Sequence, residues 1–397
     1  MDGLNKNSKS SIKTAHFVDG LVAAKHRGQK KTNKMDRNHI QKLTAEAAEL
    51  LKEMIAIPSP SFSEGKVCTY ISNWLTNRGI VHERVGNNII ARLSDHTNET
   101  SEALSAAPTL MLCAHIDTVA PCEGYTFDPY CPENCPPDMI QGLGSNDDGA
   151  SVVSMTATFR YFAESCKTKN LLLVLTCEEE RSGAKGMTSL WHEIKEKVDY
   201  AIIGEPTGMR AATSERGLLV IDATAHGISG HAARNEGVNA IEIALQDIQA
   251  MKSHEFSKVS PRMGKVNLNV TQINAGTVHN VIPDTCTFVI DIRPTEQYTN
   301  EEILSELQAI CKSELKPRNL SNRSSATYED SPLQKAAEEL GIGIFSSPTT
   351  SDWMRIDCDA IKMGPGESSR SHRKDEFVYM KEIEDGIRTY IEFINKL

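Results

Sequence analysis

The chain has 397 residues, of which 39% are hydrophobic and 24% are charged, and its formal net charge is −10 at pH 7. This length exceeds one typical hydrophobic core, so we expect two domains with the composition of a soluble globular protein. The acidic charge argues against a nucleic-acid partner, and no apolar run approaches the roughly 20 residues that span a bilayer. Ten scattered cysteines favour free thiols and a cytoplasmic location.

Residues 1–35 differ in composition from the rest of the chain. They are rich in Lys and Arg, contain only Asp2 and Asp19 as acids before Met35, and lack the apolar stretch of a secretory signal. We expect a basic, disordered extension. Translation from Met35 stays open, because a helical pattern follows Met35 directly. A nucleic-acid-binding arm is the functional alternative.

Two helices and two strands are predicted next. Residues 36–57 have the apolar spacing of an amphipathic helix. A second helix is indicated over 64–78, and strand-like runs follow at 80–83 and 88–93.

A buried strand over 109–114 ends at His115. Asp117 lies two residues further on, on the same side of an extended chain. Its carboxylate can accept the second ring proton of a metal-bound imidazole. The alternative is a structural histidine at a strand end.

The segment GLGSNDDG at 142–149 precedes an apolar helix that we expect to run to residue 163. It lacks the spacing of a phosphate-binding loop, so nucleotide binding is not indicated. Asp147 and Asp148 at the helix start fit two roles. They can cap the helix and favour its dipole, or they can present a carboxylate that bridges two cations.

Three consecutive glutamates follow an apolar strand over 171–175. No polar residue interrupts this run, which is typical of a strand buried on both faces of a parallel sheet. Glu178, Glu179 and Glu180 therefore emerge at its carboxyl end, where open α/β sheets place their ligands. A solvated acidic loop is the alternative.

Two further strands end in candidate ligands. Residues 198–203 lead to Glu205, and residues 360–363 lead to a loop that ends at His372. If the four strands are parallel, their ends face one rim of the sheet. Histidine and carboxylate side chains suit zinc or a similar divalent ion. Five such ligands fit two ions about 3.5–4 Å apart that share one Asp.

The pattern changes between residues 214 and 323 to strand, helix, strand, strand, helix. We expect an inserted α+β domain at 214–323 and a catalytic domain built from 36–213 and 324–397. The predicted fold class is α/β, with a mixed, mostly parallel central sheet flanked by helices.

Five ordered motifs, HIDTV, GLGSNDDGA, EEERSG, GEPT and GPGESSRSH, resemble one known family. This is the co-catalytic zinc amidohydrolase family that includes acetylornithine deacetylase, succinyl-diaminopimelate desuccinylase, aminoacylase and carboxypeptidase G. The resemblance covers about residues 40–397. It implies a zinc-exopeptidase-like core, a ferredoxin-like lid that dimerises, two divalent metal ions per subunit with zinc expected and cobalt as the alternative, and a homodimer.

The resemblance also implies roles for individual residues. Five side chains would bind metal: His115, Asp147, Glu180, Glu205 and His372. Asp147 would bridge the two ions, with His115 and Glu205 on one side. Glu179 would be the general base. A shift of the acidic pair by one residue, to Glu178 and Glu179, stays open.

Three residues of the insert match positions that would contact substrate in the family. His231 would reach across the dimer and polarise the scissile carbonyl, as a preorganised donor does for a developing oxyanion. A surface histidine in a Gly-rich turn is the alternative. Asn280 would contact the substrate carbonyl, and Arg293 would bind the α-carboxylate bidentately.

The tail of the chain is similar to the acetylornithine deacetylase branch, on the GPGESSRSH run beside Ser351 and Asp352. We therefore expect hydrolysis of N-acetyl- or N-succinyl-L-ornithine, a small-molecule substrate of arginine biosynthesis. Ser351 and Asp352 would contact substrate, and Arg370 and Ser371 would read a succinyl carboxylate. The alternatives are a dipeptidase or aminoacylase, a succinyl-diaminopimelate desuccinylase, and a non-catalytic binding protein on the same fold.

Overall fold

The computed structural model describes residues 37–93, 107–132, 135–165, 169–234 and 236–397. The basic extension expected at residues 1–35 lies outside the described residues. Among the helices of the described ranges, none is both long and apolar enough to cross a bilayer.

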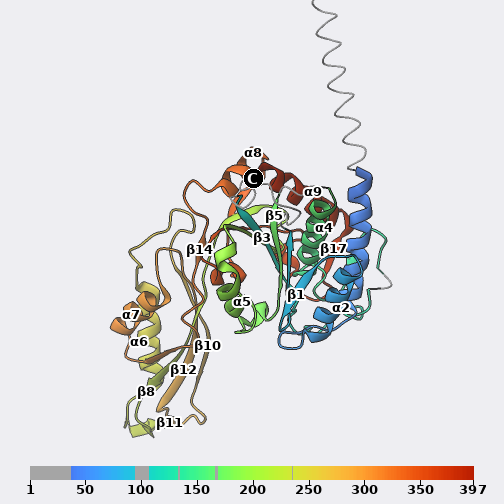
Figure 1. Ribbon diagram of the computed structural model, residues 1–397. Coiled ribbons are helices and arrows are strands. Elements are labelled where there is room, and N and C mark those ends of the chain that lie inside the picture. The colour runs from blue at the N-terminus through green and yellow to red at the C-terminus, as the bar shows by residue number, and fades with distance from the viewer. Residues whose placement is uncertain (1–36, 94–106, 133–134, 166–168, 235) are drawn as a thin grey trace, which may run out of the picture.

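A nine-stranded sheet forms the larger unit of the molecule (Figure 1). Its order is β1-β2-β5-β3-β6-β16-β7-β14, and β15 also pairs with β7. The strands are β1 (His82–Val85), β2 (Asn88–Leu93), β3 (Thr109–His115), β5 (Asn170–Thr176), β6 (Tyr200–Ile203), β7 (Ala211–Glu215), β14 (Ser325–Ala326), β15 (Ile344–Ser347) and β16 (Asp359–Lys362). The central strands β5, β3, β6 and β16 run parallel to one another, which confirms the predicted mixed, mostly parallel sheet.

Both faces of this sheet are covered because the central strands are apolar without interruption. Alternate residues of a strand point to opposite faces, and β5 supplies Leu173 to one core cluster and Leu172 to another. The first cluster contains the helix over 37–55, α2 (Gly65–Thr76), α4 (Gly149–Ser165), α8 (Pro332–Glu339) and α9 (Met380–Lys396). The second contains α5 (Met187–Ile194).

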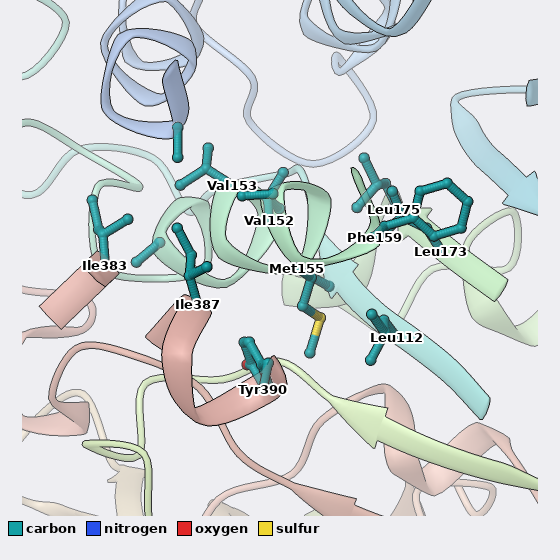
Figure 2. Packing of buried hydrophobic residues seen from close by; sticks show 14 of the residues in the cluster. Leu112, Val152, Val153, Met155, Phe159, Leu173, Leu175, Ile383, Ile387 and Tyr390 are labelled. Atoms are coloured by element: carbon teal, nitrogen blue, oxygen red, sulfur yellow. The ribbon is translucent and has the colours of Figure 1, made fainter. Parts of the chain in front are cut away.

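The helix α4 is the centre of the first cluster. Figure 2 shows Val152 and Phe159 of α4 in one cluster with Leu173 of β5 and with Ile387 and Tyr390 of α9. These side chains are buried. The helix that follows the predicted cation-binding loop is thus fixed in the sheet's largest core.

A second unit is a four-stranded antiparallel sheet in the order β10-β12-β8-β13. Its strands are β8 (Leu219–His226), β10 (Asn267–Ala275), β12 (Thr285–Arg293) and β13 (Glu314–Pro317), and α6 (Ala240–Ser253) and α7 (Asn300–Ile310) share its core. Two short pairs complete the strands: β9 (Gly230–His231) with β11 (Val281–Ile282), and β4 (Met139–Gln141) with β17 (Phe377–Tyr379). The domain limits at residues 214 and 323 stay a prediction.

Truncating Phe159 tests the packing of α4. Because this side chain is 2% exposed, we expect Phe159→Ala to lower the free energy of unfolding of the larger unit by about 3–5 kcal/mol. Tryptophan fluorescence during urea unfolding measures it, since the three tryptophans, Trp74, Trp191 and Trp353, all pack in the clusters of this unit. Leu245→Ala in α6, where the side chain is 55% exposed, is the control. A loss below about 1 kcal/mol for Phe159→Ala would contradict the packing described.

Candidate functional site

The candidate site lies at the carboxyl ends of the parallel strands. His115 is the last residue of β3, and Glu205 follows β6 by two residues. Glu179 and Glu180 form the turn η2 (Glu179–Arg181) after β5. Because these strands are parallel, their carboxyl ends meet at one rim of the sheet, where α/β proteins bind ligands.

The predicted ligands come together in two overlapping groups around His115. Ligand atoms of His115, Asp147 and Glu180 lie within 4.8 Å of one another, and so do those of His115, Glu179 and Glu205. Nε2 of His115 is 3.2 Å from Oδ1 of Asp147 and 4.0 Å from Oε2 of Glu179. Side chains from three strand ends and one helix start thus share one site.

His372 completes the group from the far end of the sequence, beyond the turn η6 (Ser368–Arg370). Its Nε2 lies 2.9 Å from Oε2 of Glu180 and 3.6 Å from Oδ2 of Asp147. The two oxygens of Asp147 therefore face different histidines, His115 and His372. One carboxylate that bridges two cations requires this arrangement.

The electrostatics of the group favour bound cations. Burial, together with the charge of Glu205, raises the pKa of Glu179 well above its ordinary value, and burial with the charge of Asp147 does the same for Glu205. Burial also raises the pKa of Glu180. Neighbouring buried carboxylates do not all ionise unless positive charge compensates them. Imidazole and carboxylate ligands fit divalent ions such as zinc, so the residues present suit a metal centre.

The structure places Glu179 and Glu180, rather than Glu178, in this group. The carboxylate of Glu178 accepts a hydrogen bond from the backbone N–H of Lys185 at 3.0 Å. The backbone N–H of Glu178 donates to buried Glu64 at 3.2 Å. The geometry therefore favours the pair 179 and 180 over the alternative shifted by one residue.

Asp117 contacts His115, as expected, and it also supports the acidic pair. Nδ1 of His115 lies 3.0 Å from the backbone oxygen of Asp117 and 3.5 Å from its Oδ1. The carboxylate mainly accepts the backbone N–H groups of Glu179 and Glu180, at 3.0 and 3.2 Å, and the hydroxyl of Ser61 at 2.7 Å. Asp117 thus orients both the histidine and the acidic pair.

Sequence reasoning missed Glu376, which holds the loop that presents Asp147. Glu376 is 2% exposed and accepts backbone N–H groups of Gly144, Asn146 and Asp147 at 2.9 to 3.0 Å. Burial raises the pKa of Glu376 to about 7. Its position four residues after His372, in a charged stretch, was the available signal.

Two residues predicted to contact substrate are engaged inside the protein. Ser351 is fully buried and donates its hydroxyl to Glu215 at 2.7 Å. Asp352 is also buried and accepts the hydroxyl of Thr176 at 2.7 Å, and burial raises the pKa of Asp352 to about 6. They support the strand ends around the site.

Arg370 and Ser371, predicted to read a succinyl carboxylate, flank the site. The guanidinium of Arg370 donates to Glu382 at 2.7 Å and lies over the rings of Phe377 and Tyr379. The hydroxyl of Ser371 is buried and has no hydrogen-bond partner among the described residues. Arg370 is therefore already neutralised by a partner.

The three residues predicted from the insert belong to the smaller unit. His231 on β9 and Asn280 before β11 are both exposed, and Figure 1 shows β11 at the end of that unit away from the larger sheet. The guanidinium of Arg293 is held by the carboxylate of Asp291 at 2.8 and 3.1 Å. The structure does not gather His231 and Asn280 with the acidic group of the same chain.

Known proteins resemble this chain over most of its length. The family model described as a peptidase dimerisation domain matches residues 213–319, and the model described as peptidase family M28 matches residues 88–213. The acetylornithine deacetylase of Proteus mirabilis is 28% identical, covering 85% of this chain and 92% of its own. The succinyl-diaminopimelate desuccinylase of Corynebacterium glutamicum is 25% identical with the same coverage of 85% and 92%.

Solved structures share the fold at lower identity. The aminopeptidase PepT from Bacillus cereus superposes with a TM-score of 0.71 at 18% identity, covering 90% of this chain and 98% of its own. The YXEP protein of Bacillus subtilis, described as a dinuclear metal-binding peptidase from the M20 family, has a TM-score of 0.67 at 14% identity, with coverage of 89% and 98%.

Replacing Glu376 tests its support of the Asp147 loop. Glu376→Gln removes the charge that accepts three backbone N–H groups, so we expect metal affinity to fall by about 10- to 100-fold while the fold is kept. Competition with a chromophoric chelator measures the affinity, and circular dichroism checks the fold. Glu392→Gln, at an exposed position of α9, is the control. Unchanged metal affinity in Glu376→Gln would show that the loop does not depend on this carboxylate.

Proposed function

We propose that this chain hydrolyses the amide bond of an N-acylated amino acid. The proposal starts from the membership of the chain in the M20 peptidase family of metal-dependent amidohydrolases. The observation that carries the proposal is the group of His115, Asp147, Glu179, Glu180, Glu205 and His372 at one rim of the sheet. A binding protein without catalysis would have no use for the buried carboxylate of Glu179 beside the metal ligands.

The proposed ligands divide into two sets that share Asp147. His115 and Glu205 would hold one ion, and Glu180 and His372 the other; contacts of Asp147 with both histidines support this division. Zinc is the expected metal and cobalt the alternative. When bound, such ions polarise the acyl carbonyl and lower the pKa of water towards neutrality.

Glu179 is the proposed general base. Its carboxylate is 4.0 Å from Nε2 of His115, and burial raises its pKa, which makes it a stronger proton acceptor than an exposed carboxylate. It takes the proton of the attacking water and then returns it to the nitrogen of the leaving amine. The two N–H groups that Asp117 accepts fix the backbone that carries Glu179 and Glu180.

The proposed substrate is N-acetyl- or N-succinyl-L-ornithine. Its hydrolysis would be a step of arginine biosynthesis in the cytoplasm. The similarity to the Proteus mirabilis acetylornithine deacetylase supports ornithine as the amine part. The similarity to the Corynebacterium glutamicum desuccinylase supports a succinyl group and keeps N-succinyl-diaminopimelate as the second candidate. The fold shared with peptidases keeps a dipeptide substrate as an alternative.

We further propose a homodimer through residues 213–319, the range that the dimerisation model matches. In this assembly His231 and Asn280 would enter the site of the partner subunit, where His231 would polarise the acyl carbonyl. Their exposed position on the β9 and β11 pair supports this role. Arg293 would bind the α-carboxylate after exchanging its contact with Asp291.

Glu179→Gln tests the general base. The variant keeps the size of the side chain but removes the proton acceptor, so we expect kcat to fall by at least about 100- to 10,000-fold. Metal content, measured by elemental analysis, should remain two ions per subunit. Glu178→Gln should retain far more activity, since its carboxylate faces Lys185. Wild-type turnover in Glu179→Gln would end this assignment.

Hydrolysis of N-acetyl-L-ornithine and N-succinyl-L-ornithine, measured side by side, tests the reaction. With zinc or cobalt added, we expect release of ornithine from at least one of them, and a chelator should abolish it because the acidic group holds the ions. Ornithine is quantified by amine derivatisation and chromatography. Release from neither substrate, combined with cleavage of dipeptides, would move the enzyme to the peptidase alternative.

A further inference from the structure

A pocket of about 130 Å³ opens beside the proposed ligand Glu205. The turn from β6 to β7, the strand β15 with the residues after it, and the end of β16 form its walls. Charged and hydroxyl side chains line much of it, including Arg210, Thr349, Lys362 and Glu367. None of the roles proposed above uses these four residues.

Lys362 supplies a fixed cation to the pocket wall. Its side chain is 2% exposed, and Nζ lies 3.0 Å from Oε2 of Glu215. Nζ also donates to the backbone oxygen of Thr349 at 3.0 Å and to its hydroxyl at 3.3 Å. Glu215 accepts hydroxyls of Ser325 and Ser351 as well, so the position of the ammonium group is fixed.

Arg210 supplies a second cation with free hydrogen-bond donors. Its guanidinium lies 4.5 Å from the centre of the Phe345 ring. Among the described residues, no carboxylate forms an ion pair with Arg210. The ring covers one face of the guanidinium, and the N–H groups at its edge remain able to bind a planar anion bidentately.

The acidic residues that line the pocket, Glu205 and Glu367, do not prevent it from binding an anion. Glu205 belongs to the metal-ligand group, so bound ions compensate its charge. The carboxylate of Glu367 lies against the turn at Gly208, where an added Cβ would meet its Oε1 at 2.8 Å. Since Glu215 balances Lys362, the unpaired guanidinium of Arg210 is the group of the pocket wall that can pair with an anionic ligand.

We propose that this pocket binds the carboxylate end of a dicarboxylic acyl group, such as succinyl, and that Arg210 selects it. The proposal rests on the proposed function, because the scissile amide must lie at the acidic group next to Glu205. A volume of about 130 Å³ is close to the roughly 150 Å³ cavity that holds benzene. It therefore accommodates the about five heavy atoms of a succinyl tail, whereas an acetyl group would leave Arg210 without a partner.

The α-carboxylate of the amino acid offers the same chemistry, and the choice of substrates separates the two. N-acetyl-L-ornithine contains only the α-carboxylate, while N-succinyl-L-ornithine contains both. We expect Arg210→Gln to lower kcat/KM for the succinyl substrate by about 10- to 100-fold, mainly through KM, as loss of a charge-assisted contact does. For the acetyl substrate the change should stay below about threefold.

Two further variants complete this experiment. Arg210→Lys keeps the charge and should restore part of the preference for succinyl, and Arg84→Gln, at an exposed position of β1, should change neither rate. Equal losses on both substrates would assign the pocket to the α-carboxylate and overturn the proposal. An unchanged rate on the succinyl substrate would overturn it too.

Calorimetric titration separates failure of the pocket from failure of the proposed function. With the metal ions bound, succinate should bind the unsubstituted protein at least fivefold more tightly than it binds Arg210→Gln, because the variant lacks the contact with Arg210. Acetate should show no difference between the two proteins. If neither ornithine derivative is cleaved but succinate binding depends on Arg210, the pocket stands and the proposed reaction fails. Succinate affinity that is independent of Arg210 would overturn the pocket.

Discussion

Repulsion among buried carboxylates at one rim of the sheet is the constraint on which the site depends. Asp147, Glu179, Glu180 and Glu205 lie within a few ångströms of His115, and water is too scarce there to screen them. Such a group is stable only with compensating positive charge, which imidazole and divalent ions provide. The parallel strands bring these charges together, because the register of β3 with β5 and β6 places the carboxyl ends of the three strands side by side.

Hydrogen bonds from backbone N–H groups fix the loops that carry the acidic group. Asp117 accepts those of Glu179 and Glu180, and Glu376 accepts three from the loop of Asp147. A carboxylate that accepts several N–H groups fixes a loop without adding a side chain to the reaction space. The same side chains on loops without these contacts would lose their fixed spacing.

The fold and the meeting of the acidic group at one rim of the sheet could be predicted, because uninterrupted apolar runs indicate buried strands and polar residues follow each run. His115 and Glu205 stood out in this way. Glu376 and the pocket at Arg210 could not be predicted, since a charged residue in a charged stretch reads as solvated surface until its neighbours in space are known. For the same reason the expected role of Arg370 did not anticipate its contact with Glu382, twelve residues further on.

The position of β16 makes completion of the site depend on residues far along the chain. This strand lies between β6 and β7 in the middle of the sheet, although more than 140 residues separate it from both in the sequence. Until residues 359–362 arrive, β6 lacks a hydrogen-bonded neighbour on one side, and an unpaired edge invites association with other chains. A chain released before residue 359 would lack both β16 and His372, which follows this strand. We therefore expect such a chain to aggregate rather than to retain weak activity.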